Sequence, residues 1–103
     1  MPSAATVTRG NVTVNSVTVA KRLDEPATAT APLAGRFWVR VVNPDPTYRL
    51  YIGYDSGTVD GTSWETADPF NGVWEGPVAA GVALYAVMET GAVSISARVI
   101  QMA

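Results

Sequence analysis

Five carboxylates lie in one irregular stretch between Asp55 and Gly76, and this stretch has the most evident capacity for chemistry. Paired carboxylates held across a cleft catalyse glycoside hydrolysis, and carboxylates spaced in a glycine-containing loop bind calcium. The segment from Asp55 to Gly61 does not keep the spacing of an EF-hand loop, which favours solvation of a surface loop and capping of turns. The five carboxylates are Asp55, Asp60, Glu65, Asp68 and Glu75.

Three aromatic residues, Trp64, Phe70 and Trp74, accompany these acids where regular core packing is least expected. Exposed aromatic side chains anchor protein interfaces, and they are also platforms on which carbohydrate-binding modules stack sugars. Trp74 stands at the expected start of a strand, which favours a place in the core. For Trp64 and Phe70, two roles stay open: exposed contacts, or lids that fold back on the ends of the domain.

The missing residue types exclude many kinds of catalysis. The chain has no His and no Cys, so it alone cannot supply a thiol nucleophile, an imidazole base or a zinc finger. A serine nucleophile would need a lysine base, and the single Lys21 lies in no Ser-Lys motif. A P-loop, a dinucleotide fingerprint and a nucleophile elbow are all absent from the sequence. We therefore expect no enzyme activity, no cofactor and no metal ion.

Length and charge limit the possible partners. The 103 residues, with a formal charge of −2, predict one small domain spanning residues 1–103 that does not bind nucleic acid. The longest nearly apolar run, residues 77–88, is too short to span a membrane, and the N-terminus lacks the features of a secretory signal, so we expect folding in a cytoplasm. Because a small domain without disulfides or metal sites is only marginally stable alone, we expect oligomerisation or docking on a larger assembly.

The pattern of Val, Thr, Gly and Pro predicts an all-β fold, a single antiparallel β-sandwich or jelly-roll-like barrel of seven or eight strands. A first strand is expected within residues 5–8, followed by a turn at Arg9 to Asn11. The next strand starts at Val12, and a change of phase at Asn15-Ser16 indicates a turn or bulge. Residues 24–34 have no clear period and are interpreted as a connection.

The strongest strand signals lie in two pairs of segments. Residues 36–54 predict a hairpin around Asn43 to Pro46, whose first strand is central because both of its faces carry large side chains. One face of that strand should lie in the core and the other under a neighbouring chain or loop. Residues 82–100 predict a closing hairpin with a turn at residues 89–91. Between the pairs, only a short strand is expected, near Thr58-Val59 or Val73-Trp74.

Three runs of the chain form a recognisable pattern, namely residues 33–43 (LAGRFWVRVVN), 50–55 (LYIGYD) and 78–87 (VAAGVALYAV). With these runs the chain resembles small all-β structural proteins of tailed bacteriophages, and the resemblance covers about two-thirds of the chain from Leu33 onward. It implies a capsid decoration, or cement, protein that binds outside the lattice of a major capsid protein, assembled as a trimer. Its place would be the outer surface of the virion, after synthesis in the bacterial host cytoplasm. The chain departs from the shared plan in its longer, Trp-rich loop.

A cement protein needs a rigid scaffold and distributed contacts rather than an active site. We expect residues 1–9 to form an extended arm, and we expect contacts from a set of six residues. An alternative is a carbohydrate-binding or host-adsorption module that uses the loop aromatics, and a third possibility is a small enzyme with a carboxylate pair. The six predicted contact residues are Val7 and Arg9 of the arm, Trp38 and Arg40 of the central strand, and Trp64 and Phe70 of the loop.

Overall fold

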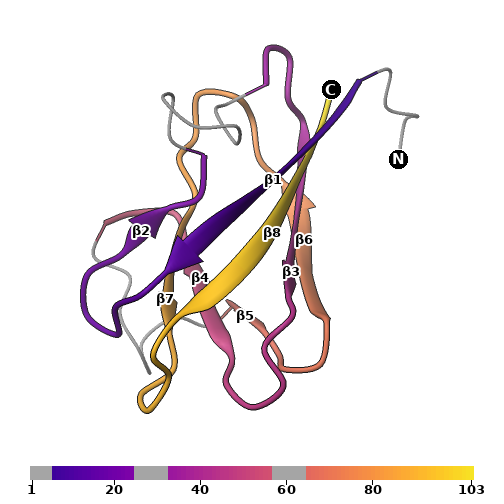
Figure 1. Cartoon of the computed structure of the whole chain (residues 1–103). Coiled ribbons are helices and arrows are strands. Elements are labelled where there is room, and N and C mark those ends of the chain that lie inside the picture. Colours follow the sequence, from indigo (N-terminus) through magenta and orange to yellow (C-terminus); the bar gives the residue numbers. More distant parts are fainter. Residues whose placement is uncertain (1–5, 25–32, 57–64) are drawn as a thin grey trace.

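The computed structural model describes residues 6–24, 33–56 and 65–103, which form strands and no helix (Figure 1). The all-β prediction and the expected number of strands are confirmed. No helix in these residues has the length and apolar character needed to cross a membrane. The strands are β1 (Val7–Val14), β2 (Lys21–Arg22), β3 (Trp38–Asn43), β4 (Leu50–Gly53), β5 (Glu65–Ala67), β6 (Gly72–Pro77), β7 (Tyr85–Met88) and β8 (Ile95–Met102).

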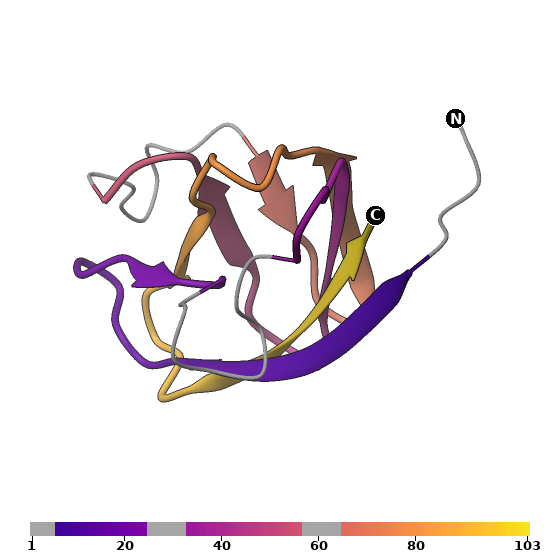
Figure 2. The same ribbon diagram turned by 90° about the horizontal axis from the view of Figure 1, so that it is seen from above.

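The strands form two antiparallel sheets in a sandwich-like arrangement. One sheet has the order β1-β8-β3-β6, and we call it the front sheet because its strands β1 and β8 lie in front in Figure 1. The back sheet has the order β2-β7-β4-β5. The pairing is nested, since β1 pairs with β8, β2 with β7, β3 with β6 and β4 with β5. Strands β1 to β4 are thus paired with strands β5 to β8, and each sheet contains strands from both halves of the chain. The view from above shows the two layers (Figure 2).

The core lies between the sheets and is built by alternation along the strands. Successive side chains of a strand point to opposite faces, so every second residue of β3 and β8 is buried and the others reach the surface. Burial of these apolar side chains is the main stabilising contribution. The core residues from strands are Val12, Val14, Val39, Val41, Leu50, Ile52, Ala67, Trp74, Ala86, Met88, Ile95, Ala97 and Val99, and Leu23, Val78 and Leu84 join them from connections.

Both predicted hairpins are wrong, because each turn carries the chain from one sheet to the other. β3 lies in the front sheet and β4 in the back sheet, and likewise β8 and β7 lie in different sheets. At the first crossing the buried Asn43 donates hydrogen bonds from Nδ2 to the carbonyls of Tyr48 (2.8 Å) and Ala67 (2.9 Å). A short turn between two half-buried strands fits a hairpin and a crossing equally well, so alternation alone cannot separate them.

The N-terminal strand is longer than expected. The predicted turn at Arg9 to Asn11 is wrong, since β1 continues through it and Gly10 pairs with Val99 of β8. Long-range pairing with β8 here overrides the local preference of glycine for a turn. Val7 and Arg9, assigned by sequence to a free arm, belong to this paired strand, and residues 1–5 lie outside the described residues. The turn predicted at Asn15-Ser16 is confirmed, because β1 ends at Val14.

Residues 65–76, which the structure describes within the stretch from residue 55 to 76, are more regular than the sequence indicated. The short strand expected at Val73-Trp74 is confirmed and extends over the whole of β6. The sequence did not predict β5, which pairs with β4 in the back sheet. The other expected strand, at Thr58-Val59, lies outside the described residues, as does Trp64.

Candidate partner-binding face

The front sheet has one face in the core and one face open. The strand register places the open-face side chains in rows, for example Arg9, Ile100, Arg40 and Glu75 across all four strands. We call this surface the outer face. Its residues are Val7, Arg9, Asn11 and Thr13 of β1, Ser96, Arg98, Ile100 and Met102 of β8, Trp38, Arg40 and Val42 of β3, and Val73, Glu75 and Pro77 of β6.

Four of the six predicted contact residues lie together on the outer face. They are Val7, Arg9, Trp38 and Arg40, which come from β1 and β3 on either side of β8. β3 is central in its sheet, as predicted, with one side in the core and the other partly exposed. Phe70 lies elsewhere, in the connection between β5 and β6. The two-sided pattern of β3 thus corresponds to a partly open strand face, and Phe70 does not lie on it.

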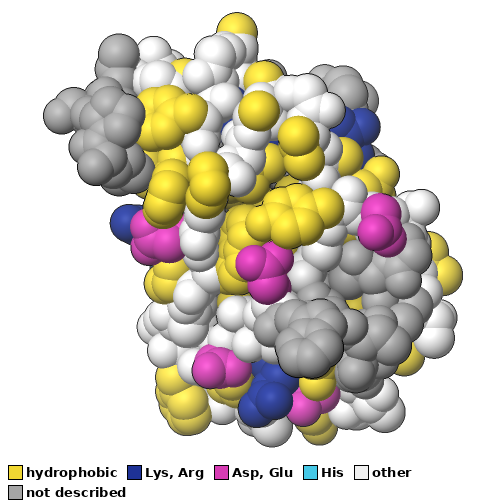
Figure 3. All heavy atoms as spheres, turned by 180° about the vertical axis from the view of Figure 1, so that it is seen from behind, with side chains coloured by type: hydrophobic (Ala, Val, Ile, Leu, Met, Phe, Trp, Pro, Cys, Tyr) yellow, Lys and Arg dark blue, Asp and Glu magenta, His cyan; other side chains and the backbone are white. Residues whose placement is uncertain are grey.

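The outer face differs in charge from the rest of the chain. It carries three arginines, Arg9, Arg40 and Arg98, against one carboxylate, Glu75, which leaves four basic and eight acidic residues elsewhere. Figure 3, the view from behind, shows several acidic side chains together with basic ones. Positive charge beside apolar groups suits a protein partner that presents carboxylates.

The single carboxylate of the outer face is neutralised by its neighbours. Glu75 Oε1 accepts a hydrogen bond from Nε1 of Trp38 (3.0 Å), and Glu75 Oε2 lies 3.3 Å from Nε of Arg40. The hydrogen bond from Trp38 and then that from Arg40 hold the pKa of Glu75 below its ordinary value near 4.5, with the charge of Arg40 adding to the effect. Arg9 and Arg98 therefore remain as the uncompensated charges of this face.

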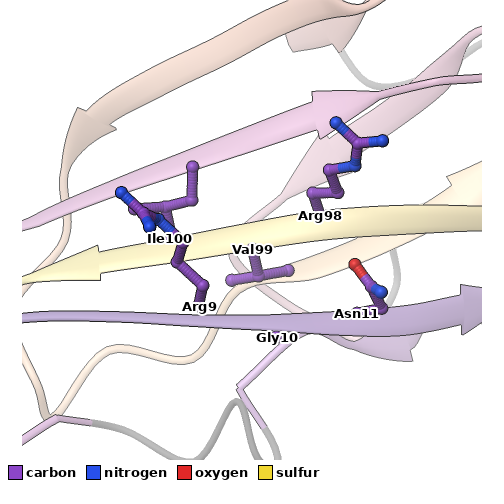
Figure 4. A pocket seen from close by; sticks show the side chains of 6 residues that line it. All are labelled: Arg9, Gly10, Asn11, Arg98, Val99 and Ile100. Atoms are coloured by element: carbon purple, nitrogen blue, oxygen red, sulfur yellow. The ribbon is translucent and has the colours of Figure 1, made fainter.

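A groove lies between β1 and β8 beside these two arginines (Figure 4). Its volume is about 270 Å³, and Gly10, without a side chain, contributes to its lining. Neither Arg9 nor Arg98 forms an ion pair with a described residue. Guanidinium groups bind carboxylates through charge-assisted hydrogen bonds, so this groove can take an acidic group together with an apolar one. Its lining residues are Arg9, Gly10, Asn11, Arg98, Val99 and Ile100.

Phe70 is an exposed aromatic side chain on a strained turn. Its side chain is 78% exposed, and both Phe70 (φ 61°) and Asn71 (φ 62°) adopt the left-handed region. Asn tolerates this region, but a bulky residue there costs about 1 to 2 kcal/mol. The turn is closed by a hydrogen bond from the Gly72 amide to the Asp68 carbonyl (3.1 Å), and a Cβ at Gly72 would lie only 2.2 Å from that oxygen. The backbone thus holds the ring in solvent rather than in the core.

Negative charge surrounds this turn. The amide of Phe70 donates to the carbonyl of Asp45 (2.9 Å). Asp68 and Glu89 each lie 3.9 Å from the guanidinium of Arg49, through Oδ1 and Oε2 respectively. Asp68 and Glu89 thus share one arginine. We call Phe70 and Asp68 together the acidic knob.

The carboxylates that suggested calcium binding or catalysis are dispersed. Glu75 lies on the outer face, Asp68 lies in the knob, and Glu65 belongs to β5 of the back sheet. Among the described residues, no group of three or more acidic side chains is placed to hold a metal ion. Asp60 lies outside those residues. Because Glu65, Asp68 and Glu75 lie on separate elements, these three carboxylates form no common site.

Trp74 is buried, as the sequence favoured, so it is unavailable to stack a sugar. Its ring contacts Tyr54 edge to face, with the ring centroids 6.2 Å apart. Burial raises the pKa of the Tyr54 hydroxyl, and the charge of Glu65 and a hydrogen bond with it act in the same direction. A phenol with a raised pKa stays protonated at neutral pH, which suits a packing role for Tyr54.

The sequence analysis missed a buried cluster centred on Arg36. The guanidinium is enclosed, and its Nη1 donates to Asp24 Oδ2 (2.9 Å) and to Gln101 Oε1 (2.8 Å). It also donates from Nε to the carbonyl of Val78 (3.1 Å) and from Nη2 to those of Ala79 (2.8 Å) and Val82 (2.6 Å). The cluster joins the start of β3, the end of β8 and the β6–β7 connection, so it acts as a structural clamp.

Comparison of the chain with protein-family models, curated proteins and solved structures gives no match. Its function is therefore inferred from its own geometry.

Proposed function

We propose that this chain is a non-enzymatic decoration protein of a tailed bacteriophage, which binds the outside of the major capsid lattice and stabilises it. The observation that carries the proposal is the nested strand pairing, first with last through to fourth with fifth. We infer from this order a jelly roll, an architecture found in viral capsid proteins, lectins and cupins. The resemblance of the chain from Leu33 onward to phage structural proteins favours the first of these classes.

The half of the outer face formed by β3 and β6 is the proposed capsid-binding surface. Trp38, Val42 and Val73 supply apolar contacts there, and the pair of Arg40 and Glu75 supplies polar ones. A protein that binds only the assembled shell stabilises it by mass action, and an oligomer that binds several sites gains avidity. We propose a homotrimer on the virion surface, synthesised in the cytoplasm of the bacterial host.

The test is co-sedimentation of the purified chain with phage capsids that lack it. Val73→Asp places a charge on the proposed surface, and Val19→Asp places the same charge on an exposed loop, as a matched control. We expect saturable binding of the wild type and the control, and at least a tenfold loss for Val73→Asp. No binding by the wild type, or equal binding by both variants, would contradict the proposal. Binding to a glycan array in place of capsids would favour the sugar-binding alternative.

A further inference from the structure

We propose that the groove between β1 and β8 binds the acidic knob of a second copy of this chain. In this contact the Phe70 ring of one copy lies against Ile100 of the next, and the Asp68 carboxylate lies between Arg9 and Arg98. The inference deepens the oligomeric part of the proposed function and rests on it, but it does not require capsid binding.

The conformation of Phe70 is the first argument. Phe70 is a bulky residue in the left-handed region with its ring in solvent, so it costs backbone strain and adds no core packing to the isolated chain. Exposed aromatic side chains of this kind are typical anchors of protein interfaces. The rigid turn, closed between Asp68 and Gly72, also presents the ring in one fixed direction, which reduces the entropy lost on binding.

Charge complementarity is the second argument. Asp68 of the knob and Glu89 flank the single cation Arg49, and the backbone carbonyl of Asp45 accepts the hydrogen bond of the Phe70 amide. The groove carries two arginines without ion-pair partners among the described residues. Each surface thus has charge that the other can compensate, and a second copy brings both in equal number.

Size and position are the third argument. In another protein, a cavity of about 150 Å³ holds a benzene molecule, so a groove of about 270 Å³ has room for a phenyl ring and a carboxylate. The groove lies beside β1, at one edge of the front sheet, and the knob precedes β6, at the other edge. The knob of one copy therefore cannot enter the groove of the same copy. Copies placed side by side can bring the knob of one into the groove of the next.

A knob that fits a groove elsewhere on the same chain makes a head-to-tail contact. Such contacts close into a ring or continue as a filament, depending on the rotation between copies. A closed ring of three copies would be the trimer of the proposed function, with every knob and every groove occupied.

The test uses sedimentation velocity and light scattering of the full chain without capsids. We expect a concentration-dependent oligomer for the wild type, and association weakened by about thirtyfold in Phe70→Ala, as for loss of an aromatic anchor. Arg98→Glu should weaken association to a similar degree. Val93→Ala, a truncation at another highly exposed site, is the control and should associate like the wild type.

Mixing the two deficient variants distinguishes this contact from a symmetric one. Arg98→Glu keeps an intact knob and Phe70→Ala keeps an intact groove, so an equimolar mixture should form a one-to-one dimer that cannot extend. A monomeric wild type, oligomers that survive both substitutions, or a mixture that stays monomeric would each overturn the inference. Because no capsid is present, these results are independent of the co-sedimentation test.

Discussion

Replacing Arg36 with methionine should destabilise the fold more than any exposed substitution. The apolar stem is retained, but the guanidinium and its five hydrogen bonds are lost. Asp24 stays buried and keeps the contact of Oδ1 with Arg22 (3.0 Å), whose side chain is partly exposed, and the hydrogen bond that Oδ1 accepts from the Leu84 amide (3.3 Å). The carbonyl of Val78, also buried at this point, loses the donor that compensates it.

The magnitude follows from the kind of contact that is broken. Removing one partner of a buried ion pair costs about 3 to 5 kcal/mol, because the other charge stays buried without compensation. A domain of this size unfolds with a free energy of about 5 to 15 kcal/mol. We therefore expect Arg36→Met to lose about 4 kcal/mol, and its melting temperature to fall by about 15 to 30 °C.

Urea unfolding followed by tryptophan fluorescence measures the effect, with Arg40→Met as the matched control. Arg40 carries the same side chain in a partly exposed ion pair at the surface, so its loss should cost about 1 kcal/mol or less. Arg36→Lys keeps the charge without the planar fork of donors and should fall between the two. Equal urea midpoints of unfolding for Arg36→Met and Arg40→Met would contradict the stabilising role proposed for the Arg36 cluster.

Two further predictions concern the knob and the outer face. Phe70→Gly should raise the free energy of unfolding by about 1 kcal/mol, since glycine adopts a positive φ without strain, while Asn71→Gly should change it less; both are measured by urea unfolding. The folded-state pKa of Glu75 is depressed, so its contribution is fully present above pH 4.5 and is lost as the pH falls through that lower pKa. The stability difference between wild type and Glu75→Gln should therefore be constant above pH 4.5 and shrink below it, and a difference that grows in acid would contradict this sign.

The alternation of buried and exposed side chains along single strands could be predicted from the sequence. Which strands pair with each other could not. The pattern of residues 95–100 correctly assigned a core side and an open side to β8, because a strand repeats every two residues. The pairing of β1 with β8 joins opposite ends of the chain and depends on packing of the whole domain. Local turn signals therefore suggested hairpins where the chain instead crosses between sheets.

The candidate site was predictable in part for the same reason. Trp38 and Arg40 were identified because both faces of their strand carry large groups, and this pattern is local. Arg36 was missed because its acidic partner lies 12 residues away and its amide partner 65 residues away, so no local signal indicated its burial. Phe70 precedes Asn-Gly, a pair that favours positive φ and indicates a turn, but its direction depends on the fold.

A cryo-electron microscopy reconstruction of capsids saturated with the purified chain tests the central claim most directly. The proposal predicts density for the chain on the outside of the shell, with Trp38 and Val73 turned toward the major capsid protein. A reconstruction in which the chain is absent from the shell, or in which the outer face points to solvent, would contradict it.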